Sequence, residues 1–135
     1  MEKEIRITNN LDEIGTLAEF IEELGAELSL SMETTMHINL ALEEAVSNII
    51  MYAYPQEEAH EIILKTSATE NQLIFFLTDN GLSFDPTSAP EVNLDIPAEE
   101  RQIGGLGIFL IRRIMNEVTY RRLDGENHLT MKKNL

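Results

Sequence analysis

One helical segment most constrains the fold, because it combines a core-facing stripe with a polar pair. At about 100° per residue, one face of the segment is apolar, as expected of an amphipathic helix. On another sector, Glu44 and Asn48 lie one turn apart among apolar neighbours. Polar groups in such surroundings are expected to line a pocket and could bind one hydrated Mg²⁺; a solvated Glu44 is the alternative. The apolar stripe comprises Ile38, Leu42, Ala45, Ile49 and Ala53.

Composition excludes several classes of protein. The chain has 24 acidic and 10 basic residues and a net charge of -14, which would repel nucleic acid and anionic lipid. It has no cysteine, so disulfides and thiolate chemistry are excluded. No apolar run approaches the ~20 residues that span a bilayer or forms a signal peptide. We therefore expect a cytoplasmic protein that binds neither nucleic acid nor membrane, with residues 1–135 forming a single domain.

The order of periodic segments predicts an α+β fold. Helices and strands alternate in a way that favours a two-layer α/β sandwich, with a mostly antiparallel mixed sheet and helices on one face. Gly25 is the expected end of the first helix, although residues 26–30 could extend or restart it, and Pro55 is the expected end of the second. The expected elements are a strand (3–8), a helix (11–24), a helix (31–54), a hairpin (62–69 and 72–79), a helix after Gly107 and a last hairpin (118–123 and 128–132).

A long segment without periodicity follows the first hairpin. It runs from Asn80 to Ile103, and its length inside a compact domain suggests a lid over about residues 82–103. The segment opens with Asp79-Asn80-Gly81, which is an ordinary turn sequence. Alternatively, a carboxylate at the end of a buried strand can accept a hydrogen bond from the exocyclic amine of adenine, and Gly81 lets the ring approach the backbone. Such a site would prefer adenine to guanine.

A glycine cluster closes the long segment. Gly104-Gly105-Leu106-Gly107 stands directly before a helical pattern, where free N–H groups can bind phosphates. A flexible hinge is the alternative for so short a cluster. No βαβ unit surrounds the cluster, and the chain contains no Gly-Lys-Ser or Gly-Lys-Thr, so neither a dinucleotide fold nor a P-loop is predicted.

Taken together, the three segments resemble the GHKL ATPases, which include histidine-kinase and gyrase-type ATP-binding domains. The sequences Glu-Ala-Val-Ser-Asn-Ile-Ile, Asp-Asn-Gly-Leu-Ser-Phe-Asp-Pro and Gly-Gly-Leu-Gly-Ile-Phe-Leu-Ile-Arg-Arg-Ile-Met are similar to those of anti-sigma factor serine kinases. The resemblance extends over nearly the whole chain, from the first strand to the last.

The resemblance implies a role for each motif. Asn48 corresponds to the Mg²⁺ ligand and Glu44 to the carboxylate that activates the attacking group. Two features depart from the pattern. Asn127 and His128 stand where many relatives have a small hydroxyl residue near the adenine, and the lid has no lysine, Arg101 being its only basic residue. The other matched residues are Asp79 and Gly81 at the adenine, and Gly105, Leu106 and Gly107 at the phosphates.

The resemblance also implies a function. It indicates an ATP- and Mg²⁺-dependent serine/threonine protein kinase that phosphorylates a small STAS-type antagonist protein and, as a homodimer, sequesters a sigma factor. Two alternatives stay open. One is a binding module in which nucleotide sets partner affinity without phosphotransfer. The other is the catalytic ATPase domain of a histidine-kinase-like protein, which would need a phosphoaccepting helical hairpin upstream.

Overall fold

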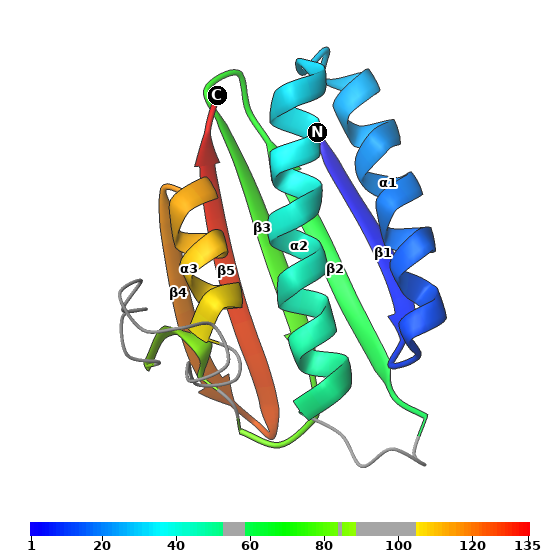
Figure 1. Cartoon of the computed structure of the whole chain (residues 1–135), viewed down its shortest axis with the longest axis vertical. Coiled ribbons are helices and arrows are strands. Elements are labelled where there is room, and N and C mark those ends of the chain that lie inside the picture. The colour runs from blue at the N-terminus through cyan, green and yellow to red at the C-terminus, as the bar shows by residue number, and fades with distance from the viewer. Residues whose placement is uncertain (53–58, 84, 89–104) are drawn as a thin grey trace.

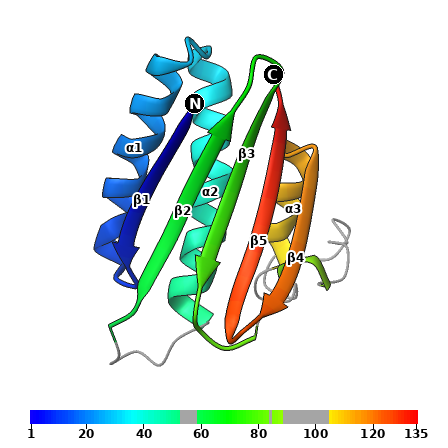
Figure 2. The ribbon, with the colours of Figure 1, turned by 180° about the vertical axis from the view of Figure 1, so that it is seen from behind.

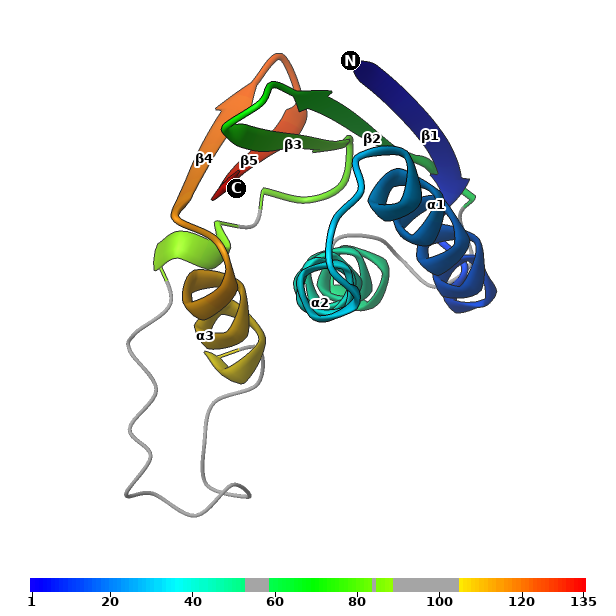
Figure 3. The ribbon, with the colours of Figure 1, turned by 90° about the horizontal axis from the view of Figure 1, so that it is seen from above.

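The computed structural model describes residues 1–52, 59–83, 85–88 and 105–135 (Figure 1). Its strands form one sheet in the order β1-β2-β3-β5-β4. Three helices cover one face of this sheet, and the view from behind shows the other face (Figures 2 and 3). The elements are β1 (Glu2–Thr8), η1 (Leu11–Glu13), α1 (Ile14–Glu27), α2 (Met32–Tyr52), β2 (Glu61–Ala68), β3 (Gln72–Asp79), η2 (Pro86–Ser88), α3 (Gly105–Ile114), β4 (Glu117–Leu123) and β5 (Glu126–Asn134).

The predicted α+β sandwich with helices on one face is confirmed. Within the described residues all four strand pairings are antiparallel, so the sheet is more regular than the mixed sheet expected from the sequence. The two predicted hairpins are β2–β3 and β4–β5. Of the lid predicted over residues 82–103, the structure describes only residues 82, 83 and 85–88, the last three forming η2.

The inner face of the sheet changes character from one edge to the other. One row of paired residues crosses all five strands and is mostly apolar. Two residues further along, β1 and β2 pair Ile7 with Ile62, whereas β3, β5 and β4 present Asp79, Asn127 and Arg122. The polar part of this second row lies at the end of β3, where the long segment begins. The first row consists of Ile5, Leu64, Leu77, Leu129 and Tyr120.

The helix α2 runs along the middle of the helical layer, between α1 and α3 (Figure 3). The predicted core stripe is confirmed for Ile38, Leu42, Ala45 and Ile49, all of which are buried. Ala53, Tyr54 and Pro55 lie outside the described residues. None of the described helices combines the length and hydropathy that a membrane span requires.

The helix does not end at Gly25, and the alternative of an extension into residues 26–30 is confirmed as far as Glu27. The helix α1 continues to Glu27, and the chain leaves it through Ser29, whose φ is 56°. Gly25 is buried against α2, where an added Cβ would lie 2.4 Å from Thr35 Oγ1. The glycine is needed for the close approach of two helices, and this contact is invisible in the local sequence. Ser31 does start α2 as predicted, because its Oγ accepts a hydrogen bond of 3.0 Å from the Thr34 N–H.

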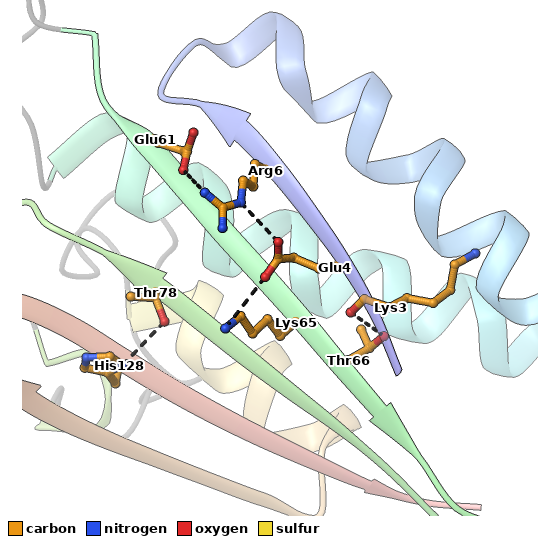
Figure 4. Close-up of polar contacts among 8 residues, drawn as sticks. All are labelled: Lys3, Glu4, Arg6, Glu61, Lys65, Thr66, Thr78 and His128. Atoms are coloured by element: carbon orange, nitrogen blue, oxygen red, sulfur yellow. Dashed lines mark hydrogen bonds and ion pairs between the residues drawn. The ribbon is translucent and has the colours of Figure 1, made fainter. Parts of the chain in front are cut away.

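The outer face of the sheet carries exposed charge pairs (Figure 4). Arg6 contacts Glu4 at 3.0 Å and Glu61 at 3.1 Å. On the same face, the His128 ring lies 3.4 Å from Thr78 Oγ1. His128 therefore faces away from the helical layer, while its neighbour Asn127 faces toward it.

Candidate functional site

The polar pair of α2 meets the glycine cluster at the start of α3. A Cβ added to Gly107 would lie 3.1 Å from Glu44 Oε2 and 3.1 Å from Asn48 Nδ2. The two helices lie side by side over the sheet (Figures 1 and 3). Because Gly107 has no side chain, α3 approaches both polar groups without displacing them. Two segments that are far apart in the sequence thus come together here.

A cleft opens between α2, α3 and the inner face of the sheet. It encloses about 390 Å³ of atom-free space, counting the part open to solvent. Asn48 lies in its wall at the α2 side, and Asp79 lies in its wall at the end of β3. The cleft therefore brings the third predicted segment to the other two. Its lining residues are Ala45, Asn48, Ile49, Asp79, Pro86, Ile111, Tyr120, Asn127 and Leu129.

Asp79 is buried, with 3% of its surface exposed, and is held by two donors. Its Oδ1 accepts hydrogen bonds of 2.9 Å from the Gly81 N–H and 2.9 Å from Asn127 Nδ2. Burial raises the pKa of Asp79, because it disfavours the charged form. These two hydrogen bonds and the charges of Arg122 and His128 act to lower the same pKa. Within the described part of the chain, the second oxygen, Oδ2, accepts no hydrogen bond.

The predicted phosphate segment is only partly described. Gly105 is the first residue of α3, and Leu106 and Gly107 follow in its first turn. Gly104 and Arg101 lie outside the described residues. The start of the predicted lid is held to α3, because Arg112 donates a hydrogen bond to the Thr87 carbonyl oxygen of η2. Pro86, also in η2, forms part of the cleft wall.

The side chains of Glu44 and Asn48 suit a hydrated magnesium ion better than a fully protein-bound metal. Asn48 is buried and Glu44 is half-buried, and neither side chain has a hydrogen bond or ion pair with the described residues. Both offer the oxygen ligands that Mg²⁺ prefers, and Mg²⁺ commonly keeps several waters. Across the described segments, no group of three or more histidine, aspartate and glutamate side chains is arranged to hold a metal.

Asn127 occupies the side of the cleft to which the sequence motifs assign no residue. Its side chain joins Asp79 to the polar residues of β4, namely Tyr120 and Arg122. The alternation along β5 carries this information, because Asn127 shares the inner face with the buried Leu129 and Met131. The alternation identifies the face, but the partners of the amide become visible only in the structure.

Known proteins with similar sequences and folds are kinases and kinase-like domains. A family model described as the histidine kinase-like ATPase domain matches residues 7–133. The serine/threonine-protein kinase BtrW of Bordetella bronchiseptica is 30% identical over 112 residues, covering 83% of this chain and 79% of that protein. The serine-protein kinase RsbW of Listeria monocytogenes is 33% identical over 99 residues, covering 70% of this chain and 63% of that protein.

Two solved structures share the fold. The RsbU and RsbW domains of Rv1364c from Mycobacterium tuberculosis superpose with a TM-score of 0.71 at 13% identity, covering 98% of this chain and 32% of that one. The histidine kinase domain of the blue-light activated kinase EL346 from Erythrobacter litoralis gives a TM-score of 0.56 at 15% identity, covering 88% and 61%. The chain thus spans less than two thirds of the Listeria kinase and of both solved chains.

Proposed function

Because the chain belongs to the histidine kinase-like ATPase domain family, we propose that it is an ATP- and Mg²⁺-dependent serine/threonine protein kinase. The observation that carries the proposal is the meeting of Glu44, Asn48 and Gly107 beside a cleft that has Asp79 in its wall. This arrangement supplies an oxygen pair for the phosphate end of a nucleotide and a carboxylate for its base end. The names of the similar kinases support phosphotransfer to a hydroxyl group.

At the base end, Asp79 accepts a hydrogen bond from the exocyclic amine of adenine through its free oxygen. Ile49, Ile111 and Leu129 supply apolar wall for the ring. Gly81 holds the other carboxylate oxygen through its N–H, and because it has no side chain, the base can approach the backbone closely. Burial of the apolar ring together with one directional hydrogen bond is typical of a nucleotide-binding pocket.

At the phosphate end, Asn48 holds the Mg²⁺ through its amide oxygen, and the N-terminal turn of α3 binds phosphate oxygens. Gly105, Leu106 and Gly107 contribute backbone N–H groups at the positive end of the helix dipole. When bound with ATP, Mg²⁺ offsets the negative charge that develops on the transferred phosphoryl group. The lack of a side chain at Gly107 keeps this turn within reach of Asn48.

Glu44 is the proposed catalytic residue. Its carboxylate lies one turn before Asn48 on α2, and its Oε2 is the atom that approaches Gly107. In this position it can accept the proton of a serine or threonine hydroxyl as the oxygen attacks the γ-phosphorus. The hydroxyl oxygen gains the phosphoryl group, ADP leaves, and the proton is held at Glu44.

The proposed partners follow from the kinases that the chain resembles. We propose that it phosphorylates a small antagonist protein of the STAS type and sequesters a sigma factor in a partner-switching circuit. We also propose that residues 1–135 form one domain that works as a homodimer. The alternative in which nucleotide only tunes partner affinity becomes an outcome of the following test.

The test separates binding from catalysis at neighbouring positions of α2. Asn48→Ala should weaken Mg²⁺-dependent binding of a non-hydrolysable ATP analogue by about tenfold or more, since a buried polar contact is lost. Glu44→Ala should leave that affinity nearly unchanged and lower phosphotransfer to the antagonist by about 10²–10⁴-fold. Calorimetry measures the first quantity, and mass spectrometry of phosphoserine on the antagonist measures the second.

Glu43→Ala is the matched control, because Glu43 is the adjacent half-buried glutamate of α2 and has no role in the proposed site. It should change neither quantity. Equal losses of binding and transfer in the Glu44 and Asn48 variants would contradict the division of roles. Intact binding without any phosphotransfer by the wild-type protein would favour the nucleotide-dependent binding module.

A further inference from the structure

We propose that Asn127 is a positioning residue that sets the purine preference of the cleft by fixing Asp79 with one carboxylate oxygen free for the base. This inference rests on the proposed nucleotide site and goes beyond it, because it assigns the choice of base to a residue outside the three recognised segments. The residue lies on β5, and its side chain enters the cleft wall from the strand beside β3.

The hydrogen bonds of the Asn127 amide leave it no capacity to read a base. Its Nδ2 donates to Asp79 Oδ1 at 2.9 Å and to the Leu82 carbonyl oxygen at 2.8 Å. Its Oδ1 accepts from the Tyr120 hydroxyl at 2.5 Å and from Arg122 Nη1 at 3.1 Å. An amide offers two N–H donors and two lone pairs, and all four are used within the protein. Asn127 therefore acts through Asp79.

The direction of these bonds determines what Asp79 can recognise. Oδ1 is occupied by the donors of Gly81 and Asn127, which leaves Oδ2 as the acceptor available to a base. Adenine presents an amine at position 6 and matches this acceptor. A purine with an oxygen at position 6, such as hypoxanthine, presents an acceptor where adenine presents a donor, so an ionised Asp79 loses the hydrogen bond to position 6.

Asn127 also opposes the effect that would protonate Asp79. Burial raises the pKa of this carboxyl, and the hydrogen bond from Asn127 lowers it again, together with the Gly81 N–H. Among the charged groups, Arg122 on β4 shares the inner face with Asp79, and His128, on the opposite face of the sheet, has a smaller effect in the same direction. Without the Asn127 donor the pKa of Asp79 would lie higher, and the neutral carboxyl, which can donate a hydrogen bond to a 6-oxo purine, would cost less to form.

The same amide ties the start of the long segment to the β4–β5 hairpin. Arg122 Nη1 donates to the Gly81 carbonyl oxygen at 2.7 Å, and Ser83 Oγ lies 3.3 Å from the Tyr120 hydroxyl. The backbone at Gly81 and Leu82 is thus held from β4 and β5 as well as from Asp79. A change at Asn127 therefore affects the orientation of Asp79 more than it affects the apolar wall of the cleft.

The experiment compares the affinities of ADP and IDP in the presence of Mg²⁺, because neither nucleotide can donate a γ-phosphoryl group. Asn127→Asp keeps the acceptor for Tyr120 and Arg122 but replaces the donor toward Asp79 with a carboxylate oxygen. Asn127→Ala removes the donor without adding charge. In both variants we expect ADP affinity to fall by about 10–100-fold and IDP affinity to fall much less, so the preference for ADP shrinks.

Two control variants change neighbouring groups. His128→Ala alters the next residue of β5, whose side chain lies on the opposite face of the sheet and has the smallest effect on the pKa of Asp79, so it should leave the preference for ADP unchanged (Figure 4). Tyr120→Phe removes one hydroxyl that donates to Asn127 and leaves both Asn127 donors in place. It should lower both affinities slightly and preserve their ratio. Cooperative urea unfolding of either Asn127 variant identifies a folded protein for the titration.

Equal losses of ADP and IDP affinity, however large, would show that Asn127 only supports the local fold, and would overturn the proposal. An unchanged ADP preference in a folded Asn127 variant would overturn it as well. The wild-type titration tests the proposed function separately. A wild-type protein that binds neither nucleotide would overturn the nucleotide site itself, whereas a wild-type preference for ADP that survives in Asn127→Asp would overturn only the role of Asn127.

Discussion

The two sides of the inner sheet face belong to one register of paired residues but carry different kinds of side chain. At the β1–β2 side, Ile7 and Ile62 are 3% and 0% exposed and lie in the apolar core that includes residues of α1. At the β3–β5–β4 side, the corresponding positions are Asp79 and Asn127, which line the cleft, and Arg122, which donates a hydrogen bond to Asn127. The apolar side needs only shape and hydrophobicity, whereas each group of the polar side needs a particular partner.

This difference predicts which positions should tolerate substitution. On the α1 side, burial of apolar surface supplies free energy without direction, so a change of volume alters stability but leaves the cleft chemistry alone. On the cleft side, the buried carboxylate is costly unless hydrogen-bonded, so its partners are specified one by one. Stability and nucleotide recognition should therefore respond to different sets of substitutions.

The largest effect on stability is expected from Leu17→Ala on the apolar side. Leu17 of α1 is fully buried, and truncating such a side chain costs about 2–5 kcal/mol of the free energy of unfolding. Urea unfolding measures the loss, and the ratio of ADP to IDP affinity in the folded variant should stay unchanged. Leu11→Ala, at a leucine that is 55% exposed, is the control and should cost less than about 0.5 kcal/mol. A changed ratio of ADP to IDP affinity in folded Leu17→Ala would contradict the claim that stability and nucleotide recognition respond to different substitutions.

A smaller loss is expected where α1 meets α2. In Gly25→Ala the new methyl group would lie 2.4 Å from Thr35 Oγ1 and 2.8 Å from Thr35 Cγ2, so the helices must separate at a cost of about 1–3 kcal/mol. Gly15→Ala is the matched control on the same helix, because a Cβ added there would meet no atom within 4 Å. Gly15→Ala should raise the free energy of unfolding by about 0.4–1 kcal/mol.

The Gly25 prediction can be checked further with a double variant. In a Thr35→Ala background the clashing Oγ1 and Cγ2 atoms are absent, and the nearest remaining contact is the Thr35 Cβ at 3.2 Å. Gly25→Ala should therefore cost clearly less in that background than in the wild-type protein, as measured by a double-mutant cycle. The same cost in both backgrounds would show that the Thr35 contact does not set the distance between the helices.

Much of the fold was predictable because it depends on periodicity. The hairpin strand predicted at 72–79 matches β3, and the core stripe of α2 is buried where described. The turn at Asp124-Gly125 also has the positive φ angles, 52° and 78°, that its residues favour. The role of Gly25 was not predictable, since a glycine at a helix end and a glycine at a helix contact have the same local sequence.

The site was predictable to the extent that its motifs carry their own chemistry. Glu44, Asn48, Asp79 and Gly107 were singled out by residue type and spacing. The structure places Asn48 and Asp79 in the wall of one cleft and Gly107 next to Glu44 and Asn48. Asn127 was noted only as a departure from the family pattern. Its function depends on hydrogen-bond partners drawn from β3, β4 and the segment after β3, and no spacing in the sequence encodes that geometry.

The smallest change in stability is expected from Asp79→Asn, and it should depend on pH. Because burial raises the pKa of Asp79, the native state binds more protons than the unfolded state between the ordinary aspartate pKa and the raised one. The free energy of unfolding contributed by this group therefore falls as the pH rises through that window. The substituted amide does not titrate, and its oxygen can still accept hydrogen bonds from Gly81 and Asn127. The free energy of unfolding of the variant should therefore rise relative to that of the wild-type protein as the pH rises from about 4 to neutrality. Asp12→Asn, on the exposed turn η1, controls for the loss of one charge. Urea unfolding across this range measures the free energy of unfolding of the variant minus that of the wild-type protein. If this difference fell with rising pH, the ionised carboxylate of Asp79 would not reduce the stability of the fold.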